Sequence, residues 1–176
     1  MEQPAKKFSN RHNNNNGNRP RRFSGRRPMV EKSEFDQKII NIRRVARVVA
    51  GGRRFSFSVA MVAGDKNGRV GVGIGKAGDT SLAIVKAFNK AKQDMVKISL
   101  TKTKSIPHEV TAKFKAAQVA LRPAKGRGLV AGSALRVVLT LVGAHDVNAK
   151  VLSRSKDKLN IARATVLALT NLKTKK

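Results

Sequence analysis

Residues 37–62 alternate between hydrophobic and polar positions, as half-buried β-strands do. The alternation stops at Gly51–Gly52, which predicts a turn between two strands. A second turn is expected at residues 64–68, because Asn67-Gly68 favours the positive φ angles of a tight hairpin. The hydrophobic positions that alternate are Ile40, Ile42, Ala46 and Val48, interrupted by Arg44, in the first strand, and Phe55, Phe57, Val59 and Met61 in the second.

A third strand is predicted after the second turn. Its inner face would carry Val70, Val72 and Ile74. Its other face would consist of glycines, which let another backbone approach closely: Gly71, Gly73 and Gly75. A helix capped by Asp79 or Thr80 should follow. It would pack on the sheet through positions spaced i, i+3, i+4 and i+7, namely Ile84, Ala87, Phe88 and Ala91. Residues 34–95 therefore predict a β-β-β-α domain.

The remaining residues, 96–176, predict a second small domain in the order β-β-β-α-β-α, so the fold class is α+β. Pro107 argues against a central position for one of its strands. A basic, glycine-rich loop at Pro123–Gly132 should precede a helix that Ser133 caps and Gly143 ends. The expected elements are strands at Val96–Leu100, Ile106–Val110, Lys113–Leu121 and Asp146–Leu152, and helices at Ser133–Val142 and Asn160–Leu172.

Residues 1–33 are rich in Asn, Arg, Pro and Ser, and this composition cannot bury a core. We expect a disordered basic tail, which either threads RNA or only keeps the chain soluble. The whole chain has a formal net charge of +28, spread over all its segments, so a polyanion is the expected partner and nucleic acid supplies the densest one. No apolar run is long enough for a membrane span, and no signal peptide or Cys is present. A soluble cytosolic protein is the expectation.

Enzymatic motifs are weak in this sequence. Gly73-x-Gly75-x-x-Gly78 matches the dinucleotide fingerprint, but its strand pairs through a hairpin and no acid ends the next strand. The three histidines, His12, His108 and His145, do not share metal-ligand spacing. We therefore expect no catalytic residues, no cofactor and no metal. A glycine turn that directs a helix N-terminus at an anion is the generic feature that remains.

Arginines give the strongest binding signal, because their guanidinium forks match phosphate oxygens. Five of them gather around the predicted tip at Gly51 and Gly52, and stacking aromatics are scarce, which favours recognition of the backbone and shape of folded RNA. These five are Arg43, Arg44, Arg47, Arg53 and Arg54. The further RNA-contact candidates are Lys66, Asn67, Arg69, Lys76, Lys86 and Lys90.

Two long segments resemble a known family. Residues 42–79, IRRVARVVAGGRRFSFSVAMVAGDKNGRVGVGIGKAGD, resemble the signature of bacterial ribosomal protein five of the small subunit. Residues 123–165, PAKGRGLVAGSALRVVLTLVGAHDVNAKVLSRSKDKLNIARAT, are similar to the second signature of that family. The resemblance covers about residues 34–172 and implies an N-terminal domain similar to double-stranded RNA-binding domains and a C-terminal α+β domain.

The resemblance also implies a function and partners. Members bind 16S ribosomal RNA, contribute to assembly and translational accuracy, line the path by which messenger RNA enters, and touch ribosomal proteins four and eight. The spectinomycin-associated loop would be Ala46–Arg53, although Ala46 and Ala50 replace the more familiar Ser and Lys. The loop facing protein four would be Lys125, Gly126, Arg127 and Gly128. The alternatives are a free double-stranded RNA-binding protein or RNA chaperone, and a nucleotide-using enzyme.

Overall fold

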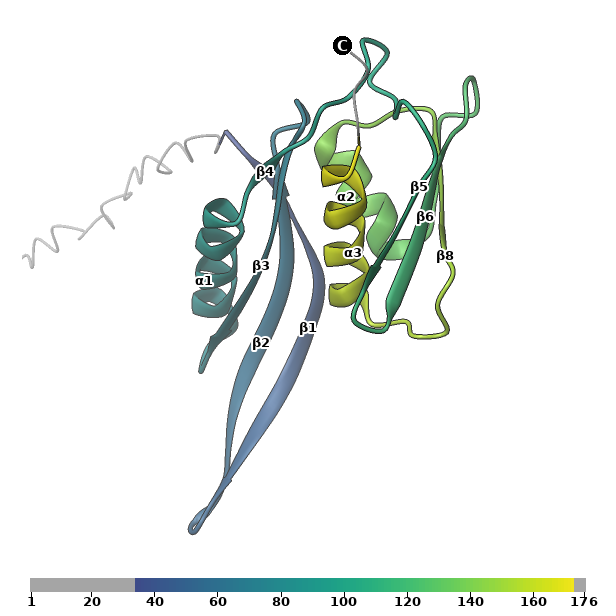
Figure 1. Ribbon diagram of the computed structural model, residues 1–176. Helices are drawn as coiled ribbons and strands as arrows, with labels where there is room; N and C mark the ends of the chain where they lie inside the picture. The colour runs from purple at the N-terminus through teal and green to yellow at the C-terminus, as the bar shows by residue number, and fades with distance from the viewer. Residues whose placement is uncertain (1–33, 173–176) are drawn as a thin grey trace, which may run out of the picture. The chain divides into compact units, whose positions relative to one another are not determined.

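The structure, a computed structural model, describes residues 34–172. The first half of this region forms a four-stranded antiparallel sheet in the order β1-β2-β3-β4, with one helix on it (Figure 1). Its long β1–β2 hairpin extends beyond the other strands, because β3 pairs with β2 only as far as Phe57. The elements are β1 (Asp36–Val49), β2 (Gly52–Gly64), β3 (Arg69–Ala77), α1 (Thr80–Gln93) and β4 (Val96–Lys97).

The glycine face of β3 carries α1, which is the close backbone approach that these glycines permit. A Cβ atom built at Gly71, Gly73 or Gly75 would clash with a backbone carbonyl oxygen of α1, so the helix lies directly on the strand. Ala83, Ala87 and Ala91 are the buried residues of the helix, while Ile84 and Phe88 are partly buried against Val59 and Met61. Small residues on both partners therefore permit this close packing.

The second half forms another four-stranded sheet, in the order β5-β6-β8-β7, with two helices. The strands β7 and β8 are parallel, and the other neighbouring strands are antiparallel. The order of elements is β-β-β-α-β-α, which confirms the predicted α+β class. The elements are β5 (Val110–Phe114), β6 (Ala117–Pro123), β7 (Leu129–Ala131), α2 (Ser133–Val142), β8 (Val147–Val151) and α3 (Lys158–Thr170).

One large hydrophobic core joins the two halves. The face of the first sheet opposite α1 contributes Val62, Val70 and Val72 to this core, and α2 contributes Val138 and Leu139. These five side chains are at most 6% exposed. Burying each such side chain stabilises the fold by about 1.5–3 kcal/mol, so the packing of α2 against the first sheet is an integral part of the fold.

Four predictions in the second half are wrong. The strand expected at Val96–Leu100 is only two residues long and pairs with β3, so it belongs to the first sheet. Residues 106–109 are not a strand, and the strand expected at Lys113–Leu121 is a hairpin of β5 and β6 that turns where Lys115 has φ 52°. The predicted loop at Pro123–Gly132 contains β7, which its parallel pairing with β8 stabilises.

The inner face predicted for β1 is also wrong in part. A bulge between Ile39 and Asn41 shifts the register, so that Ile40 is buried at 8% exposure. Beyond the bulge, Ile42 and Val48 are 48% and 75% exposed. A bulge places two residues opposite one and changes which side chains face the core. The hydrophobic residues of the hairpin arm therefore lie on its surface.

The helix boundaries follow the predictions more closely than the caps do. Gly143 ends α2 with φ 83° and donates its N–H to Leu139, as a C-terminal glycine should. Ser133, however, is the first residue of α2, and its predicted capping role is wrong because Gly132 occupies the N-cap. Asp79 is the N-cap of α1 but makes no side-chain capping bond. The boundary placed between residues 95 and 96 stays a prediction, and the predicted disordered tail, residues 1–33, lies outside the described residues.

Candidate nucleic-acid interface

The projecting end of the β1–β2 hairpin carries the predicted arginine cluster. The ladder there pairs Arg47 with Arg54, Val48 with Arg53, and Val49 with Gly52. Successive side chains of a strand point to opposite faces. The structure therefore divides the five arginines between two faces of the arm, with Arg43, Arg47 and Arg54 on one and Arg44 and Arg53 on the other.

Two of these arginines have partners within the chain. The guanidinium of Arg43 donates to the carboxylate of Asp157 at 2.9 Å, which ties the hairpin to the start of α3. The guanidinium carbon of Arg44 lies 3.8 Å from the ring centroid of Phe55, a cation–π contact. Phe55 itself is 50% exposed. Arg44 and Phe55 thus form an exposed aromatic and cationic platform that the scarcity of aromatics did not suggest.

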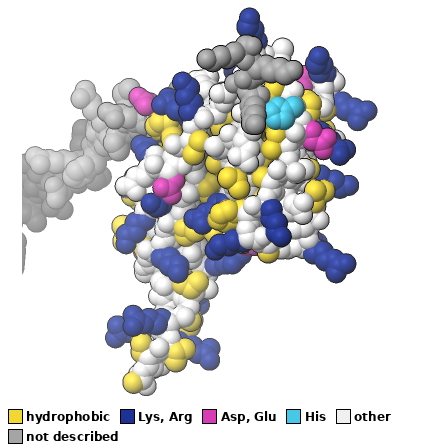
Figure 2. All heavy atoms as spheres, in the orientation of Figure 1, with side chains coloured by type: hydrophobic (Ala, Val, Ile, Leu, Met, Phe, Trp, Pro, Cys, Tyr) yellow, Lys and Arg dark blue, Asp and Glu magenta, His cyan; other side chains and the backbone are white. Residues whose placement is uncertain are grey.

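The other three arginines lack a counter-charge from the described part of the chain. Among residues 34–172, no carboxylate forms an ion pair with Arg47, Arg53 or Arg54. Arg47 and Arg54 also lie directly opposite each other, and like charges in that position destabilise a sheet. Figure 2 shows dark blue basic side chains along the arm beside yellow hydrophobic ones. Such an arrangement favours an external anion.

In the turn between β2 and β3, carboxylates of the chain balance the charges of the basic side chains. Lys66 pairs with Asp36 at 2.5 Å, and the Nε of Arg69 donates to Asp65 at 2.7 Å. Burial alone would raise the pKa of Asp65, but hydrogen bonds from the backbone and side chain of Arg69 and from the backbone N–H of Asn67 lower it overall. The carboxylate therefore remains charged and organises the turn. Lys66 and Arg69 are consequently less available to RNA than the arginines of the arm.

The remaining predicted contacts are spread over both faces of the first sheet. Lys76 lies opposite Ser58, which is itself opposite Arg43, and both cations line a hollow of about 160 Å³ that also contains Asp157. Lys86 and Lys90 are exposed on α1, which covers the other face, and Lys90 pairs with Asp94 at 3.3 Å. The structure therefore does not bring all the predicted RNA contacts into one site.

The glycine-rich segment Gly73–Gly78 does not form a phosphate cradle. The space above Gly73 and Gly75 is filled by the backbone of α1, while Gly78 has open space around it. A dinucleotide needs close access to these glycines. The packing of α1 therefore speaks against the alternative of a nucleotide site in this segment, and Gly73 and Gly75 serve helix packing.

The predicted protein-contact loop is exposed yet held in place. Lys125, Gly126 and Arg127 are exposed. Gly126 and Gly128 have φ values of 76° and 65°, which favour glycine. The N–H of Gly128 donates to the carboxylate of Asp146 at 2.9 Å. The loop is thus presented to solvent in a defined shape.

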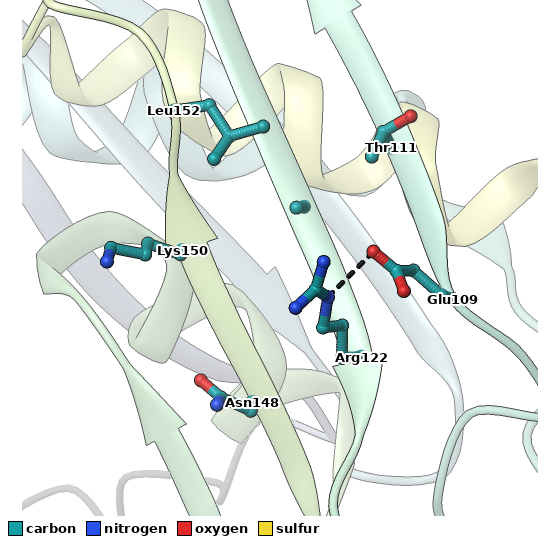
Figure 3. A pocket seen from close by; sticks show the side chains of 7 residues that line it. Glu109, Thr111, Arg122, Asn148, Lys150 and Leu152 are labelled. Carbon is teal, nitrogen blue, oxygen red and sulfur yellow. Dashed lines mark hydrogen bonds and ion pairs between the residues drawn. The ribbon is translucent and has the colours of Figure 1, made fainter.

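A hollow of about 200 Å³ lies on the open face of the second sheet (Figure 3). Its side chains come from three neighbouring strands, among them Thr111, Arg122 and Lys150. The Nε of Arg122 donates to Glu109 at 2.7 Å, so the carboxylate of this hollow is already paired. In residues 34–172, no group of three or more metal-binding side chains occurs. None of the helices described there is long and apolar enough to cross a membrane.

Charge and geometry together define the class of protein. Residues 34–172 contain 26 Lys and Arg against eight acids, and five of these acids are already used in ion pairs. An α+β body with this excess and a protruding cationic arm is typical of structural nucleic-acid-binding proteins.

Comparison with known proteins gives the family. The family model described as "Ribosomal protein S5, N-terminal domain" matches residues 35–99. The model described as "Ribosomal protein S5, C-terminal domain" matches residues 112–176. The chain belongs to the ribosomal protein S5 family, which confirms the resemblance seen in the sequence. This is a family of structural ribosomal proteins and not of enzymes.

Several relatives carry the name small ribosomal subunit protein uS5. One from Treponema pallidum is 49% identical over 144 residues, covering 81% of this chain and 83% of the relative. One from Mycoplasmopsis agalactiae is 46% identical over 143 residues, covering 81% of this chain and 62% of the relative. A uS5c protein from Emiliania huxleyi is 43% identical over 142 residues, covering 80% of this chain and 89% of the relative.

Proposed function

We propose that this protein is a structural component of the small ribosomal subunit that binds 16S ribosomal RNA through the β1–β2 arm. The observation that carries the proposal is the Arg47–Arg54 pair, two like charges held opposite each other without a carboxylate partner in the described chain. Phosphate groups would relieve this repulsion and accept hydrogen bonds from both guanidinium groups. Because the family is one of ribosomal proteins, the RNA that we propose as the partner is ribosomal RNA.

The finer roles extend from this binding. We propose that the arm contributes to subunit assembly and translational accuracy, and that the protein lies beside the path by which messenger RNA enters. Ribosomal proteins four and eight are the proposed protein partners. The loop of Lys125, Gly126, Arg127 and Gly128 is the proposed contact with protein four, supported by its exposure and its fixed backbone.

The arm is tested by replacing Arg53 and Arg54 with Ala in the full chain. We expect weaker binding to isolated 16S RNA, by about 1.5–3 kcal/mol for each charge-assisted bond lost, and reduced incorporation into reconstituted small subunits. The matched control is Lys113→Ala with Lys150→Ala, which removes the same charge from exposed strand positions of the second sheet. Equal binding by the arm variant and the parent chain would contradict the proposal.

The alternative of a free double-stranded RNA-binding protein or RNA chaperone predicts a different behaviour in a sucrose gradient. A ribosomal component should sediment in stoichiometric amount with small subunits after a salt wash. A chaperone should leave them, because electrostatic contacts without a fixed place on the subunit weaken steeply with salt.

A further inference from the structure

A second basic hollow lies away from the arm, beside the turn between β2 and β3. It has a volume of about 390 Å³ and is lined by lysines from three parts of the chain: the turn, β4 and the linker that follows it. Figure 1 shows this linker running from β4 of the first sheet to β5 of the second. The side chains used in the argument are Lys66, Asn67, Lys97, Ser99 and Lys104.

The backbone holds two of these lysines in unusual conformations. Lys66 and Lys104 have φ values of 58° and 54°, a left-handed region that residues other than glycine seldom adopt. The N–H of Lys66 donates to the carbonyl of Leu141 at 2.9 Å, and the carbonyl of Lys104 accepts from the N–H of His145 at 2.7 Å. Both lysines are thus fixed to the segment that ends α2. Conformations of this kind persist only where the surrounding structure enforces them.

The charge of the hollow is only partly balanced. Lys66 pairs with Asp36, but Lys97 and Lys104 form no ion pair with a carboxylate of residues 34–172. Asn67 and Ser99 are exposed and add amide and hydroxyl groups. The hollow therefore offers hydrogen-bond donors and net positive charge, which suit an oxyanion.

The surroundings favour RNA phosphates over an acidic protein segment. Protein interfaces depend on apolar or aromatic anchors in a desolvated centre. Here Ile98 is buried at 5% exposure, Leu100 is half-buried, and no aromatic residue lines the hollow. Bases would have no ring on which to stack, whereas the backbone phosphates require only cations and donors.

We propose that this hollow binds backbone phosphates of folded RNA through Lys97 and Lys104, with Lys66 and Asn67 at its edge. The inference rests on the proposed function, because ribosomal RNA is the polyanion concerned. Bound phosphates would join the turn of the first sheet to the linker of the second. The two sheets would then be held to one RNA surface at a place separate from the arm.

The first test is the double variant Lys97→Gln with Lys104→Asn in the full chain, since Asn tolerates a left-handed backbone. The matched control is Lys113→Gln with Lys115→Asn, because Lys113 is likewise on a strand and Lys115 likewise has a positive φ, 52°. Binding to isolated small-subunit RNA is measured at several salt concentrations. The slope of log K against the logarithm of the salt concentration should become shallower by roughly one unit per lysine replaced. The control should keep the slope of the parent chain. Equal slopes for the test variant and the parent would overturn the proposal.

Amine-reactive labelling of the unmodified chain supplies an independent readout. Lys97 and Lys104 should be protected by isolated RNA alone, and as strongly as in assembled subunits. Protection that appears only after other ribosomal proteins are added would overturn the proposal in favour of a protein partner. If the chain enters subunits while both lysines stay reactive, the hollow does not bind phosphates and the proposal for it is overturned, while the proposed function stands. A chain that neither binds the RNA nor enters subunits would overturn both.

Discussion

The two ends of β2 are turns built in opposite ways. At residues 65–68 the backbone bonds to α2, with Lys66 donating to Leu141 at 2.9 Å and Gly68 donating to Val142 at 3.0 Å. At the arm, a Cβ atom added to Gly51 or Gly52 would have nothing within 4 Å. The first turn is therefore part of the packed body, and the second is free of it.

The charges differ in the same direction. In the packed turn, Asp36 and Asp65 balance Lys66 and Arg69, while at the tip Arg47 faces Arg54 without a described carboxylate partner. Two basic turns of one strand thus differ in whether residues 34–172 supply a counter-charge. Where they do, the cations stabilise the fold, and where they do not, the cations are available to an external anion.

The same substitution at both ends should separate packing from exposure. Gly64→Ala places a Cβ atom against the carbonyl oxygen of Leu141 and 2.9 Å from its carbonyl carbon, so we expect a loss of roughly 3 kcal/mol in the free energy of unfolding. Gly51→Ala should change it by less than about 0.5 kcal/mol. Denaturant unfolding of both variants measures the difference. Equal stabilities would show that α2 can move away from the packed turn at little cost.

Removing the carboxylate of the packed turn should have the next largest effect. Asp65→Ala deletes an acceptor of three hydrogen bonds, two from Arg69 and one from Asn67, and should cost about 2 kcal/mol at neutral pH. Asp36→Ala, which removes only an exposed ion pair, should cost less than about 1 kcal/mol.

The effect of Asp65 should depend on pH in a defined direction. Because its pKa is lowered in the folded state, its contribution is complete above the ordinary aspartate range and disappears as the pH falls through the folded value. Unfolding curves of the parent chain and Asp65→Ala should therefore converge in acid. A constant difference down to low pH would mean that Asp65 acts through packing and not through its charge.

The sequence predicted those parts of the fold whose signals are local. Asn67-Gly68 marked one turn, Gly51–Gly52 marked the tip, and the glycines of β3 indicated that another backbone approaches closely, which the structure identifies as α1. The arginines of the arm were found because they stand near one another along the chain. These features needed only alternation, turn chemistry and residue size.

Features that depend on distant residues could not be predicted in this way. The strand β7 is three residues long and depends on its pairing with β8. Arg43 meets Asp157 across a separation of 114 residues, which removes one cation from the predicted cluster. The bulge near Ile40 changed which side chains of β1 are buried, because alternation alone cannot show an inserted residue.

Backbone conformation at the tip should have a smaller effect than packing at the other turn. Gly52 has φ 124°, a region that residues with a side chain rarely adopt, so Gly52→Ala should cost about 1 kcal/mol even though the space is open. Gly51→Ala, one residue away and without a positive φ, is the control. The difference in thermal stability between the two variants measures the cost of placing a side chain at a positive φ. If both variants unfold together, the tip can change its turn without cost.

The smallest effect should have the opposite sign. Arg54→Thr introduces a residue that favours strands and removes the repulsion between Arg54 and Arg47. The isolated protein should therefore become more stable by roughly 0.2–1 kcal/mol. Arg69→Thr removes a partner of Asp65 and should instead destabilise the protein. The gain from Arg54→Thr should shrink at high salt, because exposed charges are then screened.

The sign of that change decides between two interpretations of the arm. If Arg54→Thr stabilises the free protein but weakens its binding to 16S RNA, the arginine is retained at a cost in stability because it binds an external anion. If it destabilises the free protein as much as Arg69→Thr does, the arginines of the tip hold the hairpin together as those of the packed turn do. The arginines at both ends of β2 would then have the same structural role, and the main observation that supports the arm as the RNA contact would be lost.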